Sequence, residues 1–224
     1  MIYGHFGKTG ELALRLDDAP VRAVMEKDEH LARLIGRIGD LTIRLTPDPF
    51  CALAMAIIGQ QLSLKAAAAI QRRVLALAPS FAPEELLKVE EERLREAGLS
   101  RAKVASIRDL CVKVLSGEVA LDGLREMDDE AVIAMVTRVK GIGRWTAEMF
   151  LLFSLGRPDV FSAADLGLQR AVQRLYRLSE RPDKAQMELY GKRWAPYRSV
   201  ASFYLWESLK RNWDHEVDDA CPSH

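Results

Sequence analysis

The chain has 224 residues, of which 49% are hydrophobic, and its 32 basic and 32 acidic residues give a formal net charge of zero. This length and apolar content suffice for a sizeable core in one domain or in two joined lobes. No apolar run is long enough to span a bilayer, and residues 1–11 lack the basic start and apolar middle of a secretory signal. We therefore expect a soluble intracellular protein without a membrane partner.

Cysteine and histidine are few and widely separated, which argues against a disulfide framework and against a zinc site. Their positions are Cys51, Cys111, Cys221, His5, His30, His215 and His224. The three cysteines also cannot supply the four clustered thiolates of an iron-sulfur loop. No redox or catalytic metal is expected.

Helical periodicity dominates from Ala19 onward, and no repeated strand pattern supports a large sheet. A helix is predicted within 28–38, ending at Gly39, and 42–45 is predicted as a short extended piece before Pro47. Further helices are predicted over 50–59, 64–77, 83–88, 90–97, 101–117, 121–126, 129–139, 144–155, 163–176, 183–194 and 198–210. The prediction is an all-α protein.

Three segments stand out along this helical chain. The first, PFCALAMAIIGQQLSLKAAAA at 49–69, contains two helices joined by a polar turn at Gln60, Gln61 and Ser63. By itself the turn indicates no more than a connection between helices. The other two segments are more specific.

The second segment, VKGIGRWTAEMF at 139–150, has two glycines that interrupt a helical pattern. Gly141 and Gly143 can take positive φ, and they let an external group approach the peptide N–H donors. A helix begins at Arg144, where the macrodipole favours an anion such as phosphate. A glycine pair can also be only a turn, and the side chains of Lys140 and Arg144 are either phosphate contacts or solvated charges.

The third segment, DVFSAADLGLQRAV at 159–172, places Asp165 at the head of an apolar-periodic stretch. A carboxylate there can be a helix cap and nothing more. Its spacing after the glycine hairpin makes the combination more specific than either part.

Together these segments resemble the helix-hairpin-helix DNA glycosylases, and within them the alkylpurine glycosylases of the 3-methyladenine DNA glycosylase II type. The likeness runs from about Thr46 to Trp213. It implies two helical lobes with the extruded base held in the cleft between them. The lobes would be 46–157, with the wedge turn and the hairpin, and 1–45 plus 158–213, with the catalytic Asp; residues 214–224 would be a tail.

The resemblance implies a mechanism in which Asp165 stabilises an oxocarbenium-like transition state and orients or deprotonates the attacking water. Relatives that also cut the strand carry a lysine directly after the GxGR turn, and this chain has Trp145 there. We therefore expect a monofunctional glycosylase that leaves an intact abasic site, without AP lyase activity and without a cofactor for catalysis.

By the same resemblance, Trp145, Tyr197 and Met149 line the base pocket, where stacking and cation–π attraction favour a cationic alkylated purine. Either aromatic residue could instead belong to the core. Met149 stands where some relatives have an aromatic residue, which puts the substrate ranking in doubt. Gln61 matches the residue that fills the gap left by the extruded base, and Leu62 could wedge the opposite side.

The hairpin carries two further implied sites. Backbone N–H groups of Gly141, Gly143, and Arg144 or Thr146 would clamp a phosphate beside the lesion. In similar proteins, main-chain carbonyls of the hairpin also hold a structural monovalent or hard cation. The matching carbonyls in this chain are those of Thr137, Val139 and Ile142.

The implied partner is double-stranded DNA containing alkylated bases: 3-methyladenine first, with 7-methylguanine and 1,N6-ethenoadenine as further candidates. The protein would act as a monomer, in the bacterial cytoplasm at the nucleoid or in a nucleus. Zero net charge is unusual for a DNA binder, but acidic residues collect at 84–96, 122–130 and 214–219, away from the predicted site. The alternatives are a non-catalytic helix-hairpin-helix binder of distorted or damaged DNA, and the same fold acting on another lesion.

Overall fold

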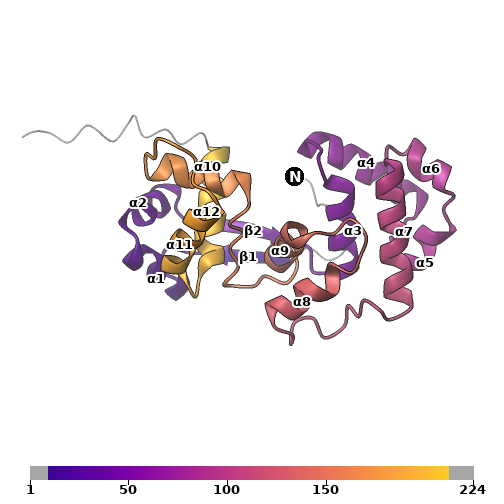
Figure 1. Cartoon of the computed structure of the whole chain (residues 1–224), viewed down its shortest axis with the longest axis horizontal. Coiled ribbons are helices and arrows are strands. Elements are labelled where there is room, and N and C mark those ends of the chain that lie inside the picture. Colours follow the sequence, from indigo (N-terminus) through magenta and orange to yellow (C-terminus); the bar gives the residue numbers. More distant parts are fainter. Residues whose placement is uncertain (1–9, 212–224) are drawn as a thin grey trace, which may run out of the picture. The chain divides into compact units, whose positions relative to one another are not determined.

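The structure is a computed structural model that describes residues 10–211 (Figure 1). Within this range the chain forms twelve helices and a two-stranded sheet of β1 and β2. The elements, in chain order, are β1 (Gly10–Leu14), α1 (Ala19–Lys27), α2 (Glu29–Ile38), β2 (Leu41–Leu45), α3 (Pro49–Gly59), α4 (Leu64–Leu77), α5 (Pro83–Lys88), α6 (Glu91–Glu96), α7 (Arg101–Leu115), α8 (Asp129–Val136), α9 (Arg144–Phe153), α10 (Leu166–Leu175), α11 (Lys184–Trp194) and α12 (Arg198–Lys210). None of the described helices is long and apolar enough to cross a membrane.

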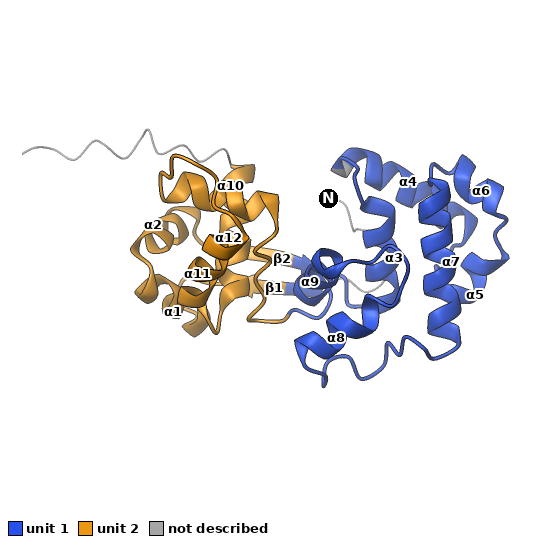
Figure 2. Cartoon of the chain, in the orientation of Figure 1, with its two compact units in different colours: residues 1–11, 44–156 blue, residues 12–43, 157–224 orange. Residues whose placement is uncertain are grey.

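The chain divides into two compact units (Figure 2). Unit 1 comprises residues 1–11 and 44–156, and unit 2 comprises residues 12–43 and 157–224. The lobes predicted from the sequence are 46–157 and 1–45 with 158–213. The predicted tail at 214–224 lies outside the described residues.

Unit 1 is organised around α3. Pro49 occupies the first turn of this helix, where its missing N–H costs nothing, and the Asp48 side chain accepts the Cys51 N–H at 2.6 Å. Leu53 and Ile57 have no exposed surface because α4, α7 and α9 surround the helix. A helix that is apolar on nearly every side must lie at the centre of its unit.

Unit 2 is organised around α12, which packs against α1, α2, α10 and α11. Beside this core, the buried Asp28 carboxylate caps α2 by accepting the Leu31 N–H at 3.1 Å. It also accepts the Tyr176 hydroxyl and, at 2.9 Å, the indole N–H of Trp194. One carboxylate therefore ties α2 to the end of α10 and to α11.

The predicted all-α class is confirmed, and three local predictions need correction. Residues 121–126 form turns, with Gly123 at φ 74°, and not the predicted helix. The helix predicted at 163–176 begins three residues later, at Leu166, because Asp165 is extended and caps it. Strand β1 was not predicted, since β2 alone carried an extended pattern.

We expect Asp28→Ala to lower the free energy of unfolding of the protein by about 3 kcal/mol, because three donors lose one buried acceptor. Urea unfolding followed by circular dichroism measures this change. The matched control is Asp183→Ala, at the exposed N-cap of α11, where loss of the cap costs only about 1 kcal/mol. Equal effects of the two substitutions would contradict the role assigned to Asp28.

Candidate functional site

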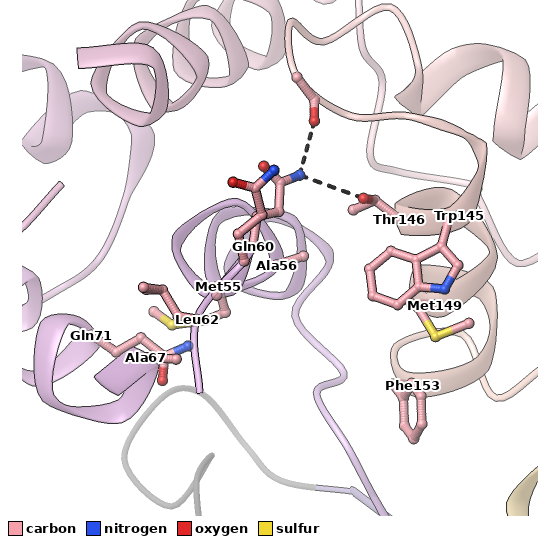
Figure 3. Close-up of a pocket in the computed structure, with 13 residues that line it drawn as sticks. Met55, Ala56, Gln60, Leu62, Ala67, Gln71, Trp145, Thr146, Met149 and Phe153 are labelled. Carbon is pink, nitrogen blue, oxygen red and sulfur yellow. Dashed lines mark hydrogen bonds between the residues drawn. The ribbon is translucent and has the colours of Figure 1, made fainter. Parts of the chain in front are cut away.

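Unit 1 contains a pocket of about 620 Å³ between α3, α4 and α9 (Figure 3). None of the residues that line it has an ionisable side chain. They are Met55, Ala56, Gly59, Gln60, Gln61, Leu62, Ala67, Gln71, Gly141, Trp145, Thr146, Met149 and Phe153. The pocket is therefore neutral and largely apolar, and its polar side-chain groups are amides, one hydroxyl and the indole N–H of Trp145.

One wall of the pocket is a single face of α9. Trp145, Met149 and Phe153 recur every four residues, so their side chains lie on the same side of the helix (Figure 3). Trp145 is 46% exposed, which rules out the alternative that this indole belongs to the core. Phe153 was not singled out from the sequence, although its spacing from Met149 is the signal that could have found it.

The turn between α3 and α4 forms the opposite rim. Gln61 is exposed and sits at φ 56°, in the left-handed region that disfavours residues with a side chain. Leu62 is half-buried, and Ser63 caps α4 by accepting the Ala66 N–H at 3.3 Å. Gln61 and Leu62, the two predicted wedge residues, therefore both lie at the pocket on a turn held in a strained conformation. We name residues 60–63 the wedge turn.

Gln60 joins this turn to the glycine hairpin. Its side-chain Nε2 donates to the carbonyl of Gly141 at 2.9 Å and lies 3.5 Å from the Thr146 hydroxyl (Figure 3). The Thr146 side chain is thus buried in the pocket wall, so only the backbone N–H of this residue can serve the predicted phosphate contact. The sequence analysis left Gln60 as part of a polar turn because its partners lie more than eighty residues away.

The two hairpin glycines serve different purposes. Gly141 has φ 81°, and a Cβ there would stand 2.6 Å from the hydroxyl of Ser106. Gly143 is extended at φ −95°, a conformation open to any residue, and a Cβ there would meet nothing within 4 Å. Only Gly141 uses the left-handed region. Gly143 instead leaves open space in front of α9.

That open space faces a helix start without a capping side chain. Gly143 is the N-cap of α9, and it has no side chain that could accept the first N–H groups of the helix. The other described helices of unit 1 with eight or more residues, α3, α4, α7 and α8, all begin with an Asp or Ser side chain that does. The first N–H groups of a helix have no acceptor within the helix, and the start of α9 lies beside the space that Gly143 leaves open.

The Arg144 side chain forms ion pairs, which the sequence did not predict, and its phosphate contact stays a prediction. Its guanidinium binds both carboxylate oxygens of Glu130, one of them at 2.9 Å, and its Nε lies 3.1 Å from Glu148. The hydrogen bond with Arg144 holds the pKa of Glu130 below its ordinary value, and the same bond raises the pKa of Arg144. The side chain is an ion-paired group, and it ties α8 to α9.

Asp165 lies in unit 2, where it is 9% exposed and caps α10. Its Oδ1 accepts the Leu168 N–H at 2.7 Å and the indole N–H of Trp206 at 3.0 Å. A Cβ on Gly167 would stand 2.9 Å from the same oxygen, so glycine is needed for this close packing. The cap predicted for Asp165 is present, and Trp206 is a neighbour that the sequence analysis missed.

Two other predicted groups are not among the residues that line the unit 1 pocket. Tyr197 is half-buried at the N-cap of α12 in unit 2, next to Arg198, which binds Asp159 through two nitrogens. In the hairpin, the Val139 carbonyl accepts the Ile142 N–H at 3.1 Å. These placements leave the roles predicted for Tyr197 and for the hairpin carbonyls as predictions.

Residues 54–196 match the family model described as HhH-GPD superfamily base excision DNA repair protein, so the chain belongs to this superfamily. It is similar to DNA-3-methyladenine glycosylase 1 of Schizosaccharomyces pombe, with 33% identity over 190 residues, 82% of this chain and 83% of the relative. The family assignment made from the sequence motifs is confirmed.

Solved structures agree with this assignment. A DNA-3-methyladenine glycosidase from Bacillus halodurans is 41% identical with a TM-score of 0.79, and the match covers 88% of this chain and 92% of that one. The 3-methyladenine DNA glycosylase Mag1 of Schizosaccharomyces pombe, in complex with abasic DNA, is 32% identical with a TM-score of 0.78, covering 86% and 97%. The fold of the chain is therefore that of helix-hairpin-helix glycosylases.

The two hairpin glycines should differ in their effect on stability. We expect Gly141→Ala to lower the free energy of unfolding by about 2 kcal/mol, because alanine is strained at positive φ and meets Ser106. Gly143→Ala should cost less than about 1 kcal/mol, as at an N-cap position. Urea unfolding of the two single variants measures the difference, and a larger loss for Gly143→Ala would contradict the assignment.

Proposed function

We propose that the protein is a monofunctional DNA glycosylase that removes alkylated purines from double-stranded DNA: 3-methyladenine first, with 7-methylguanine and 1,N6-ethenoadenine as further substrates. The observation that carries the proposal is a neutral, aromatic pocket directly beside an uncapped helix N-terminus. The relatives named above support the same activity. The protein would act as a monomer in base-excision repair.

The chemistry of the pocket supports alkylated purines as the substrate class. A purine alkylated at N3 or N7 carries a formal positive charge, so it is a good leaving group and does not need to be protonated by the enzyme. The unit 1 lining offers no acid for that purpose, since every one of its side chains is neutral. Trp145, half-exposed at the pocket, offers instead a ring face that attracts a cation.

The uncapped start of α9 supports a phosphate-binding role for the hairpin. Backbone N–H groups at a helix N-terminus bind phosphate without reading sequence, as repair of lesions in any context requires. The open space at Gly143 lets a phosphodiester reach these groups. Gln61, exposed on the wedge turn, would enter the duplex and fill the gap left by the extruded base.

Asp165 would supply the carboxylate of the reaction. As the bond between the anomeric carbon and the purine nitrogen breaks, its electron pair leaves with the base and the sugar gains positive charge. A carboxylate stabilises that charge, and it accepts a proton as water adds to the anomeric carbon. The bonds from Leu168 and Trp206 fix Asp165 in one orientation, which suits this task. Trp145 at the lysine position of strand-cutting relatives leaves no amine there for a Schiff base.

We also propose that the hairpin holds a structural monovalent cation through the main-chain carbonyls of Thr137, Val139 and Ile142. The Thr137 hydroxyl bonds back to Ile133, so this residue would contribute only its carbonyl. The neighbouring Arg138 carbonyl accepts the Lys113 ammonium at 2.6 Å, so carbonyls of this loop already take a positively charged partner. Such oxygen ligands suit a hard cation, whose charge would compensate that of the phosphate.

The direct test is release of free bases from randomly methylated DNA, separated by chromatography. We expect the wild type to release 3-methyladenine, and Asp165→Asn to lower this rate by at least about a thousandfold while binding of abasic DNA is retained. Asparagine keeps the helix cap, so the loss reports on the charge. The control Asp183→Asn changes a cap of the same kind on α11 and should leave the rate unchanged.

Undiminished release by Asp165→Asn would overturn the assigned role. A wild type that binds abasic or methylated DNA tightly and releases no base would select the alternative, a non-catalytic binder of damaged DNA. A strand break formed without added base, or a covalent product trapped by borohydride, would contradict the monofunctional mechanism.

The indole should discriminate by charge. We expect Trp145→Leu to lower the release of cationic 3-methyladenine about tenfold, because the cation–π attraction is lost, and to lower the release of neutral 1,N6-ethenoadenine by a smaller factor. Single-turnover rates on two oligonucleotides that differ only in the lesion measure the ratio. An equal loss on both lesions would show that the ring acts by stacking alone.

A further inference from the structure

Helix α7 presents a stripe of polar residues toward the two loops of the proposed DNA interface. Lys103, Ser106, Asp109 and Lys113 are spaced by three, three and four residues, so they lie on one face of the helix. We name these four residues the α7 stripe. None of them lines the pocket, and the sequence analysis assigned no role to any of them.

At one end of the stripe, Lys103 holds the wedge turn. Its ammonium donates to the carbonyls of Ile58 at 2.8 Å and Gln60 at 2.7 Å. These carbonyls end α3 and lack the N–H partners of the helix interior, and a positive charge is favourable at this end of a helix. Partial burial lowers the pKa of Lys103. Gln61, in its strained left-handed conformation, directly follows the carbonyl that Lys103 holds.

The rest of the stripe holds the hairpin. The Ser106 hydroxyl lies under Gly141, where it leaves no room for a Cβ. Asp109 accepts the backbone N–H of Lys140 at 2.7 Å, and Lys113 donates to the carbonyl of Arg138 at 2.6 Å.

Gln60 connects the two loops to each other. Its carbonyl accepts from Lys103, and its side chain donates to the carbonyl of Gly141 at 2.9 Å (Figure 3). Wedge turn, α7 stripe and hairpin thus form a closed ring of hydrogen bonds around backbone atoms. A shift of one loop along α7 without the other would stretch the Gln60–Gly141 hydrogen bond.

We propose that the α7 stripe fixes the spacing between the wedge turn and the hairpin, and that Lys103 is a positioning residue that acts through Gln61 in base extrusion. This rests on the function proposed above. With the hairpin bound to a phosphate, Lys103 and Gln60 would keep Gln61 at a set distance along the strand, aimed into the duplex. Without Lys103, the end of α3 relaxes and Gln61 loses that aim.

The test is a double-mutant cycle on single-turnover release of 3-methyladenine, with Lys103→Met and Gln61→Ala. We expect Lys103→Met to lower the rate about tenfold in the wild-type background and less than about twofold in the Gln61→Ala background, because a residue that acts through Gln61 has little left to position. A purely structural role would lower the rate equally in both. Fluorescence of 2-aminopurine beside the lesion should show reduced extrusion in Lys103→Met.

The matched control is Arg108→Met on the same helix. Arg108 donates to the carbonyls of Leu87, in the last turn of α5, and Val89, just after it, so it is also a cation at the end of a helix, and these contacts involve neither loop. We expect its removal to leave the release rate within about twofold. If Lys103→Met is unfolded by circular dichroism, Lys103→Gln takes its place in the cycle, since glutamine keeps a donor without the charge.

The outcomes separate the two proposals. Equal effects of Lys103→Met in both backgrounds, or a wild-type rate for Lys103→Met, would overturn the positioning role while leaving the glycosylase intact. Absence of base release by the wild type would instead overturn the proposed function. Non-additive loss with reduced extrusion would establish the positioning role.

Discussion

A helix that begins without a capping side chain needs other contacts to hold its start in place, because the cap that would stabilise its first turn is missing. Helix α9 meets this constraint in unit 1. The loop before this helix is held by hydrogen bonds from outside it, one to Asp109 and one from Gln60, and its Gly141 packs against Ser106. The polar residues behind the hairpin follow from that requirement.

Asp165 meets a related constraint in unit 2. The catalytic role proposed for Asp165 requires a carboxylate held in one position, and the helix cap does this with a backbone N–H that the fold already supplies. The Trp206 indole adds a second donor, and Gly167 leaves room for both. Asp28 has the same arrangement in the core of unit 2, where one buried carboxylate accepts hydrogen bonds from an indole N–H and a backbone N–H. Capping and catalysis are thus compatible roles for one side chain.

The sequence predicted what depends on local pattern. Periodicity located most helices, Gly141 occupies the left-handed conformation expected of it, and Asp165 stands at a helix start as expected. Local pattern failed at 121–126, where six residues around a left-handed Gly123 were too short a stretch to separate turns from a helix. The pairing of β1 with β2 is set by contacts between distant segments, which a single sequence does not display.

The missed site residues share one physical reason. Gln60, Lys103 and Asp109 bind backbone atoms of segments that are distant in sequence. Any residue type can present a backbone carbonyl or N–H, so no complementary side chain marks the partner. Trp206 was missed for a similar reason, since only the fold brings its indole to Asp165.

The ion pairing of Arg144 has a consequence for how the protein would dissociate from DNA after base release. The Arg144 side chain has its charge matched by Glu130 and Glu148, so it brings no net positive charge to the proposed grip of the amide dipoles on the strand. Counterions leave the nucleic acid in proportion to the positive charge brought to it, and dipoles bring none. The affinity of such a contact depends little on counterion release, so it weakens only slightly as ionic strength rises. The contact also adds no long-range electrostatic attraction that would hold the protein on undamaged duplex.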